Sequence, residues 1–170
     1  MQEKTNMSAR KRNRLKDFDY SLIGDYSITI CTNNRKKLFW IEDYMCYQSC
    51  VESYSQLLTP LGKMVCAEIE KTSEKYNNRV VVEKYVVMPD HIHMIVSINN
   101  ANEENGCCLT IPRIVNQLKR SVTIKSNIKG IWQRSYYDHI IRNEKDYDEE
   151  WDYIDANPRK LTGNVQLKCL

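Results

Sequence analysis

The sequence lacks any long hydrophobic run. Among its 170 residues there is no stretch of about 18 consecutive apolar side chains, which excludes a conventional membrane-spanning helix. Residues 1–16 carry six lysines and arginines but no apolar segment of the kind that a secretory signal peptide needs. We therefore expect a cytoplasmic protein that has no membrane partner.

The seven cysteines also lack the spacing of a structural zinc site. Such sites usually need two well-spaced pairs, whereas this chain offers Cys46 with Cys50 and the adjacent Cys107 and Cys108. An odd number of cysteines in a chain without a secretion signal argues against a disulfide framework as well. We expect free thiols.

Charge is nearly balanced but unevenly distributed. The chain has 25 lysines and arginines against 22 acids, a net charge of +3 that does not by itself indicate nucleic-acid binding. Basic residues gather at the N-terminus, at 35–37 and at 119–120, while acids concentrate between Glu144 and Asp152. We predict a basic, flexible N-terminal arm over 1–20 and a single catalytic domain over 21–165.

Hydrophobic periodicity predicts seven elements along that domain. Period-two alternation and β-branched residues predict strands over 26–32, 79–88, 91–98 and 131–141. Helical spacing predicts three helices, capped by Thr59, Thr110 and Asn143, of which the last should end near Asn157 because Pro158 follows. The stretch 36–58 has no clear pattern.

The order of these elements predicts the fold class. The first six form a strand–helix–strand–strand–helix–strand series, which is typical of an α+β, ferredoxin-like antiparallel sheet with helices packed on one face. The third helix is an addition at the C-terminal end of this core.

The strand at 91–98 carries a pair of histidines. Side chains alternate along a strand, so His91 and His93 share one face while Ile92 and Met94 point to the other, toward the core. Two neighbouring imidazoles can bind one cation, although a structural or solvated role stays open for the pair on its own.

The third predicted helix offers a second pair of polar side chains. Tyr153 and Asn157 are four residues apart and therefore lie on one face of the helix. Taken alone, a tyrosine in a helix is most often a packing residue, and an asparagine near a helix end is only a polar terminus.

Several blocks of the sequence resemble a known family. The segment 85–96 (YVVMPDHIHMIV) resembles the MPNHxH signature of REP-associated tyrosine transposases and related insertion-sequence transposases. The segments 132–143 (WQRSYYDHIIRN) and 153–158 (YIDANP) resemble two further blocks of that family, and 26–39 resembles its first strand and turn. The blocks occur in the family's order and span about 22–160.

The resemblance implies an HUH endonuclease-like fold and a function. His91, His93 and Asn157 would bind a divalent metal, Mg²⁺ or Mn²⁺, and Tyr153 would be the nucleophile. The implied activity is cleavage and rejoining of single-stranded or hairpin DNA through a 5′-phosphotyrosine, in transposition or in the processing of repetitive hairpins. The covalent intermediate conserves the bond energy, so rejoining needs no ATP.

Six basic residues are candidates for DNA contact, and the roles of two further residues, Asp90 and His139, are left undecided. The basic candidates are Arg35, Lys36, Lys119, Lys125, Arg134 and Arg142, each of which could equally be a solvated surface charge. Asp90 departs from the asparagine that usually precedes the first histidine, and its effect on metal and phosphate is open. For His139, beside two isoleucines that look buried, a structural or DNA-contact role is favoured over metal binding.

Other functions remain compatible with the sequence. The chain could be a domesticated relative that cleaves hairpins without moving itself, a DNA-hairpin-binding relative that kept the fold and lost catalysis, or a metal-dependent hydrolase of small phosphoesters that does not use Tyr153. No feature decides between a monomer and a homodimer.

Overall fold

The computed structural model describes residues 23–42, 53–99 and 109–163. In chain order its elements are β1 (Gly24–Cys31), the short 3₁₀ helices η1 (Asn33–Arg35) and η3 (Tyr54–Leu57), α1 (Pro60–Lys75), β2 (Val80–Met88), β3 (His91–Ile98), α2 (Ile111–Ser126), β4 (Tyr137–Ile141) and α3 (Glu144–Thr162). The expected N-terminal arm over 1–20 lies outside the described residues.

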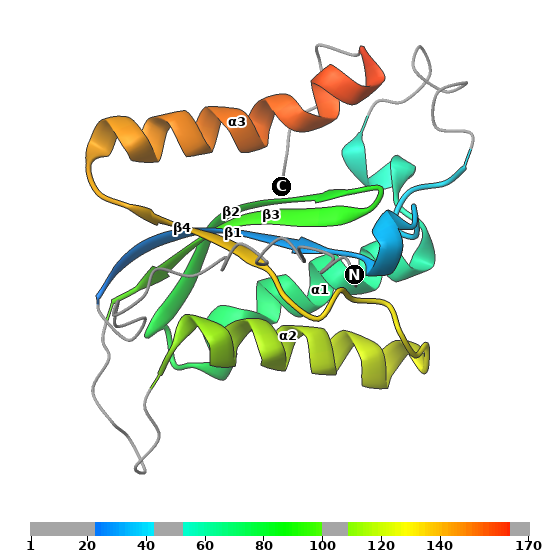
Figure 1. Ribbon diagram of the computed structural model, residues 1–170, viewed down its shortest axis with the longest axis horizontal. Coiled ribbons are helices and arrows are strands. Elements are labelled where there is room, and N and C mark those ends of the chain that lie inside the picture. Colours follow the sequence, from blue (N-terminus) through cyan, green and yellow to red (C-terminus); the bar gives the residue numbers. More distant parts are fainter. Residues whose placement is uncertain (1–22, 43–52, 100–108, 164–170) are drawn as a thin grey trace, which may run out of the picture.

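The four strands form one antiparallel sheet in the order β2-β3-β1-β4. Helices α1 and α2 cover one face of this sheet, and α3 crosses the opposite face (Figure 1). The ferredoxin-like core and the added C-terminal helix were both predicted, and both are confirmed. Within the described ranges, no helix combines the length and apolar character needed to cross a membrane.

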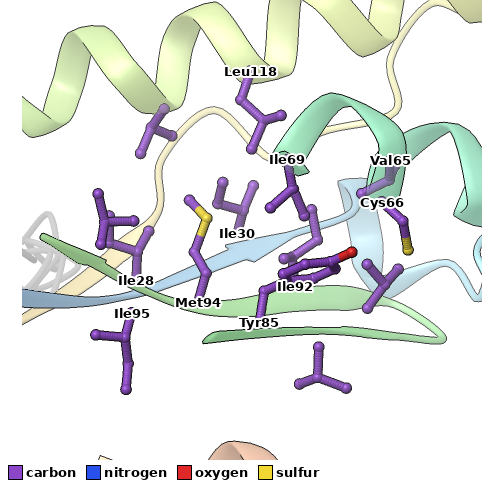
Figure 2. Close-up of a cluster of buried hydrophobic side chains, with 14 of the residues drawn as sticks. Ile28, Ile30, Val65, Cys66, Ile69, Tyr85, Ile92, Met94, Ile95 and Leu118 are labelled. Atoms are coloured by element: carbon purple, nitrogen blue, oxygen red, sulfur yellow. The ribbon is translucent and has the colours of Figure 1, made fainter. Parts of the chain in front are cut away.

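The main hydrophobic core lies between the sheet and helices α1 and α2. Ile28 and Ile30 of β1 and Met94 of β3 point toward these helices and are almost completely buried (Figure 2). Ile95, the next residue of β3, points to the other side of the sheet and is also buried (Figure 2). Alternation along β3 therefore places an apolar residue under α3 as well.

Helix α1 begins as the sequence predicts, and its first turn is packed tightly. The Thr59 hydroxyl accepts a hydrogen bond from the Gly62 amide at 3.1 Å, and Pro60 occupies the first turn. A side chain at position 62 would overlap the Phe39 carbonyl oxygen, so glycine is required there. Thr110 caps α2 in the same way, by accepting from the Arg113 amide.

Two side chains from the described parts of the segment without a clear sequence pattern cover part of the outer edge of β2. The Trp40 indole donates a hydrogen bond to the Val87 carbonyl at 2.6 Å, and the Tyr54 hydroxyl binds the same carbonyl. The Tyr54 hydroxyl also accepts from the Val87 amide at 2.7 Å. Side chains thus bind backbone groups that an edge strand would otherwise expose.

Strand β4 is shorter than predicted, because it begins at Tyr137 rather than at 131. The Lys119 ammonium of α2 donates to the carbonyls of Gln133 and Ser135 at 3.0 and 2.9 Å. These carbonyls are therefore bound to a side chain instead of a neighbouring strand. Only an isolated bridge between Thr32 and Trp132 remains in the predicted first half.

Helix α3 does not stop at Pro158, and the prediction of its end was wrong. It continues to Thr162 and ends at Gly163, whose left-handed φ of 70° is typical of a C-cap. A proline removes one backbone donor, but the turns around it stay bonded. The Gly163 amide donates to the Arg159 carbonyl at 2.8 Å, and the Thr162 hydroxyl donates to the Pro158 carbonyl at 2.8 Å.

Candidate active site

His91 and His93 lie side by side on the face of β3 that α3 crosses. Their ring centroids are 4.8 Å apart and their planes meet at 85°. The apolar neighbours Ile92 and Met94 are buried on the opposite face, so the strand cannot slip by one residue without burying the histidines in the main core.

The Nδ1 atom of each histidine has a side-chain partner. His91 Nδ1 lies 2.5 Å from Asp90 Oδ1, and His93 Nδ1 lies 2.8 Å from the hydroxyl of Thr29. Thr29 reaches His93 because the two residues are paired in register on β1 and β3. When Nδ1 is occupied in this way, Nε2 is the ring atom that can bind a metal.

Burial keeps both imidazoles neutral at physiological pH. It lowers the pKa of His93 to about 3, and the neighbouring His91 adds to this shift. Burial also lowers the pKa of His91, although the hydrogen bond to Asp90 acts in the opposite direction. Neutral imidazole is the form that coordinates metals.

Helix α3 brings Tyr153 against this pair. The Tyr153 ring meets the His93 ring edge to face, with centroids 5.2 Å apart and planes at 89°. Tyr153 is nonetheless 45% exposed, so its hydroxyl stands at a surface rather than in a closed cavity. The structure thus joins two motifs that are sixty residues apart in sequence.

Asn157 lies one turn after Tyr153 on α3, and one of its side-chain polar atoms makes no hydrogen bond. Its side-chain nitrogen is buried and has no hydrogen-bond partner among the described residues. The unpaired atom is an N–H donor, which suits water or a phosphate oxygen, so a metal ion would bind the amide oxygen of Asn157 instead.

The donor set fits a divalent ion with open coordination positions. Two imidazole nitrogens and one amide oxygen suit ions such as Mn²⁺ or Mg²⁺ that also take oxygen ligands from a substrate. The described residues contain no group of three or more His, Cys, Asp or Glu side chains able to hold a metal. An ion bound here would therefore depend on Asn157, substrate and water for the ligands beyond the two histidines.

Polar contacts attach α3 to the sheet. The Ser27 hydroxyl of β1 donates to Glu150 at 2.6 Å, and the Lys84 ammonium of β2 lies 2.9 Å from Asp155. The same ammonium lies 4.2 Å from the ring centroid of Trp151. Part of the acidic character of α3, which looks unfavourable for DNA, thus serves to attach the helix.

Arg35 is the basic candidate that the structure brings to the site. Its guanidinium lies 3.4 Å from the second carboxylate oxygen of Asp90, whose first oxygen contacts His91. The backbone at Asn34 and Arg35 is left-handed, with φ of 55° and 53°, an arrangement that persists where surrounding contacts enforce it. Lys36 is exposed beside this turn.

The structure does not bring Lys119 and Lys125 to the site. Both belong to α2, on the opposite face of the sheet from Tyr153 (Figure 1). Lys119 is buried and binds backbone carbonyls, and Lys125 pairs with the buried carboxylate of Glu68. Their contacts are structural.

The remaining basic candidates lie at opposite ends of β4, with Arg134 before the strand and Arg142 between it and α3. Arg134 and Arg142 are exposed. His139 was expected beside buried isoleucines, but Ile140 and Ile141 are only partly buried and His139 is exposed. Its Nε2 lies 2.8 Å from Asp146, the residue whose amide is capped by Asn143, so His139 has a partner at the helix start and is separate from the paired histidines.

Sequence reasoning missed Thr29, the partner of His93. The signal for it was present in β1, where Ser27 and Thr29 alternate with the apolar Ile28 and Ile30. That alternation indicates a strand with one polar face, but the partner strand has to be known before Thr29 can be assigned to a histidine.

The chain is similar to known bacterial proteins. No family model matches it. An uncharacterized protein of Haemophilus influenzae is 31% identical over 168 residues, covering 88% of each chain. The REP-associated tyrosine transposase of Escherichia coli K12 is 32% identical over 106 residues, which cover 62% of this chain and only 59% of that protein.

A solved structure extends the likeness over most of the chain. The REP-associated tyrosine transposase bound to a REP hairpin superposes with a TM-score of 0.59 at 25% identity. The match covers 91% of this chain and 74% of that one.

Proposed function

Because this chain belongs to the family of the REP-associated tyrosine transposases, we propose that it cleaves and rejoins single-stranded or hairpin DNA through Tyr153. One observation carries the proposal: the Tyr153 ring packs against His93, one of two adjacent histidines whose Nδ1 atoms are both engaged. A packing tyrosine would not need this neighbour or its exposure to solvent.

His91, His93 and Asn157 would hold the metal, Mg²⁺ or Mn²⁺. When bound, such an ion withdraws charge from a non-bridging phosphate oxygen and so reduces the repulsion that protects a phosphodiester. Asp90 and Thr29 keep the two imidazoles in the orientation that presents Nε2.

Tyr153 would perform the transfer. A bond forms between its phenolic oxygen and phosphorus while the bond from phosphorus to the 3′ oxygen breaks. The phenol loses its proton, the 3′ oxygen gains one, and the downstream strand stays attached as a 5′-phosphotyrosine. The reverse reaction, with a 3′ hydroxyl as the attacking group, rejoins DNA without ATP.

The exposure of Tyr153 favours a macromolecular substrate over a small phosphoester. A small molecule is usually enclosed by a concave pocket that buries most of its surface. Here the candidate nucleophile is 45% exposed on a helix that runs along the outside of the sheet. A DNA strand could lie across this surface, and the solved relative bound to a REP hairpin supports that choice.

The test is covalent capture of DNA. Hairpin oligonucleotides labelled at the 3′ end are incubated with the protein and Mn²⁺, then separated on a denaturing gel. We expect a protein–DNA adduct with wild type, none with Tyr153→Phe, and an unchanged amount with Tyr147→Phe. The control removes the same hydroxyl from a residue of α3 that stacks on Trp151, at a centroid distance of 5.9 Å.

Each other outcome selects a different function. Cleavage that survives Tyr153→Phe contradicts the tyrosine mechanism and supports a metal-dependent hydrolase. Hairpin binding without cleavage by wild type supports a non-catalytic relative. An adduct that carries a 5′ label instead of a 3′ label reverses the proposed polarity.

A further inference from the structure

Lys160 stands beside Tyr153 on the last part of α3. Residues 153, 157 and 160 follow the spacing of one helical stripe, so the lysine continues the line formed by Tyr153 and Asn157. The Lys160 ammonium lies 5.5 Å from the centroid of the Tyr153 ring. A cation therefore sits over the ring of the candidate nucleophile.

The other two cations of α3, and Lys84 of the neighbouring strand β2, already have carboxylate partners. Arg159 pairs with Asp155, Lys84 pairs with the same carboxylate, and Lys145 lies 3.7 Å from Glu149. No carboxylate of the described residues pairs with Lys160, which is exposed. Its charge is thus available to an incoming anion.

We propose that Lys160 binds the phosphate that Tyr153 attacks and holds it as the phosphotyrosine. This inference rests on the proposed function, but it assigns a further catalytic residue that contacts the substrate. A lysine ammonium is a compact charge with three donors on a flexible stem, suited to a phosphate whose oxygens move during the transfer.

The chemistry gives this charge two uses. The phosphodiester carries one negative charge before attack and after it, and further negative charge develops on the phosphoryl oxygens in between, so a cation there stabilises the transition state more than either end state. The phenol gives up its proton as its oxygen bonds to phosphorus, and a nearby ammonium favours the developing phenolate. Lys160 needs to neither gain nor lose a proton for either effect.

The first test is the rate of adduct formation in a single turnover. Lys160→Gln should slow the adduct about tenfold or more, whereas Lys160→Arg, which keeps the charge, should stay within about threefold of wild type. Lys145→Gln is the matched control, since it removes the same charge from α3 two turns before Tyr153. Equal thermal unfolding of the variants shows that α3 remains folded.

The second test needs no catalysis. In the Tyr153→Phe background, fluorescence anisotropy compares single strands that end in a 5′ phosphate with strands that end in a 5′ hydroxyl. The phosphate-ended strand imitates the cleaved product and should bind more tightly. Adding Lys160→Gln should abolish this preference, and adding Lys145→Gln should leave it intact.

Together the two tests separate the inference from the proposed function. If wild type forms the adduct and Lys160→Gln forms it at the same rate, the role of Lys160 is wrong and the proposed function stands. If wild type forms no adduct, the proposed function fails, and the preference for the 5′-phosphate strand then tests the role of Lys160 on its own. A preference that depends on Lys160 then supports a phosphate site, and a preference without that dependence overturns it.

Discussion

The two faces of the sheet are built differently. Helix α2 has 16 residues and buries six of them, whereas α3 has 19 residues and buries only three. The face under α1 and α2 is a hydrophobic core, and the face under α3 combines a few apolar residues with histidines, hydroxyls and ion pairs. Stability is concentrated on one side, and the reactive groups are concentrated on the other.

The polar side chains of the two faces also differ in how fully they are hydrogen-bonded. Glu68 on α1 is buried, and burial alone would raise its pKa, but hydrogen bonds from Lys125, Ser121 and Lys75 lower the pKa to about 2. This carboxylate is fully paired between two helices. Asn157, on the α3 side, is half-buried, and its buried side-chain nitrogen has no hydrogen-bond partner among the described residues. A satisfied network suits a structural role, and an unsatisfied group suits a site that binds something.

The largest effect should come from breaking the structural face. Glu68→Ala removes the shared partner of Lys75 and Lys125 and opens a gap between α1 and α2. Because both lysines are partly exposed and can be solvated, we expect a loss of about 2–3 kcal/mol in the free energy of unfolding. Urea denaturation measures it. Glu74→Ala, an exposed acid on the same helix, should change stability by less than about 0.5 kcal/mol. Similar losses in both variants would contradict this assignment.

Acid should weaken the two faces in different pH ranges. His93 has its pKa lowered to about 3 in the folded chain, while an unfolded histidine titrates near about 6.5. The unfolded chain therefore binds more protons between these values, and stability falls as the pH drops below about 6.5. Between pH 7 and pH 5 we expect a loss of about 1–2 kcal/mol in urea denaturation.

Glu68 responds at lower pH, because its pKa is lowered from the usual carboxyl range to about 2. The stability that this carboxylate contributes is therefore lost only as the pH falls toward 2. Replacing both His91 and His93 by glutamine should remove most of the loss between pH 7 and pH 5. Replacing the exposed His139 should not. A loss that persists without the two histidines would assign it to other groups.

Metal affinity should respond to Asp90 more modestly. Asp90→Asn removes the carboxylate that orients His91, and we expect the dissociation constant for Mn²⁺ to rise about tenfold, or about 1.4 kcal/mol. Isothermal titration calorimetry measures it, with Asp148→Asn as a control on the exposed part of α3. Tighter binding by Asp90→Asn would show that the carboxylate works against the metal.

The smallest effect should come from removing one of the contacts that attach α3 to the sheet. Lys84→Met removes the ion pair with Asp155, but Arg159 still binds that carboxylate, so we expect a loss of only about 0.5–1 kcal/mol. Hydrogen exchange should rise in α3 and stay unchanged in α2. Equal changes in both helices would mean that the two faces unfold as one unit.

Local patterns predicted most of the fold. Alternation located the β2–β3 hairpin, and threonines before proline-containing turns located the starts of α1 and α2. The late start of β4 was not predictable, because it depends on Lys119 binding two carbonyls from another element. The continuation of α3 past Pro158 was missed for a related reason, since the contacts that offset a proline are not visible in its own sequence.

The residues of the candidate site also fall into those that local patterns predict and those that only the fold brings together. The histidine pair follows from strand periodicity, and Tyr153 and Asn157 follow from helical spacing, but their approach required the fold. Resemblance to a family suggested that they act together, and neither periodicity nor spacing did. The partners Thr29 and Lys160 belong to contacts between or along elements that carry no motif of their own.

Gly62 connects the packing of α1 to the position of the β2–β3 turn, which leads to the histidines on the other face of the sheet. The Phe39 carbonyl against which it packs also accepts from the Thr59 amide, and the amides of Leu38 and Phe39 both donate to the Pro89 carbonyl, at 2.9 and 3.1 Å. Pro89 immediately precedes Asp90 in the β2–β3 turn. A methyl group added at position 62 would push on this backbone and shift the turn that orients His91. Variation in the first turn of α1 is therefore constrained by the geometry of a histidine on the other side of the sheet.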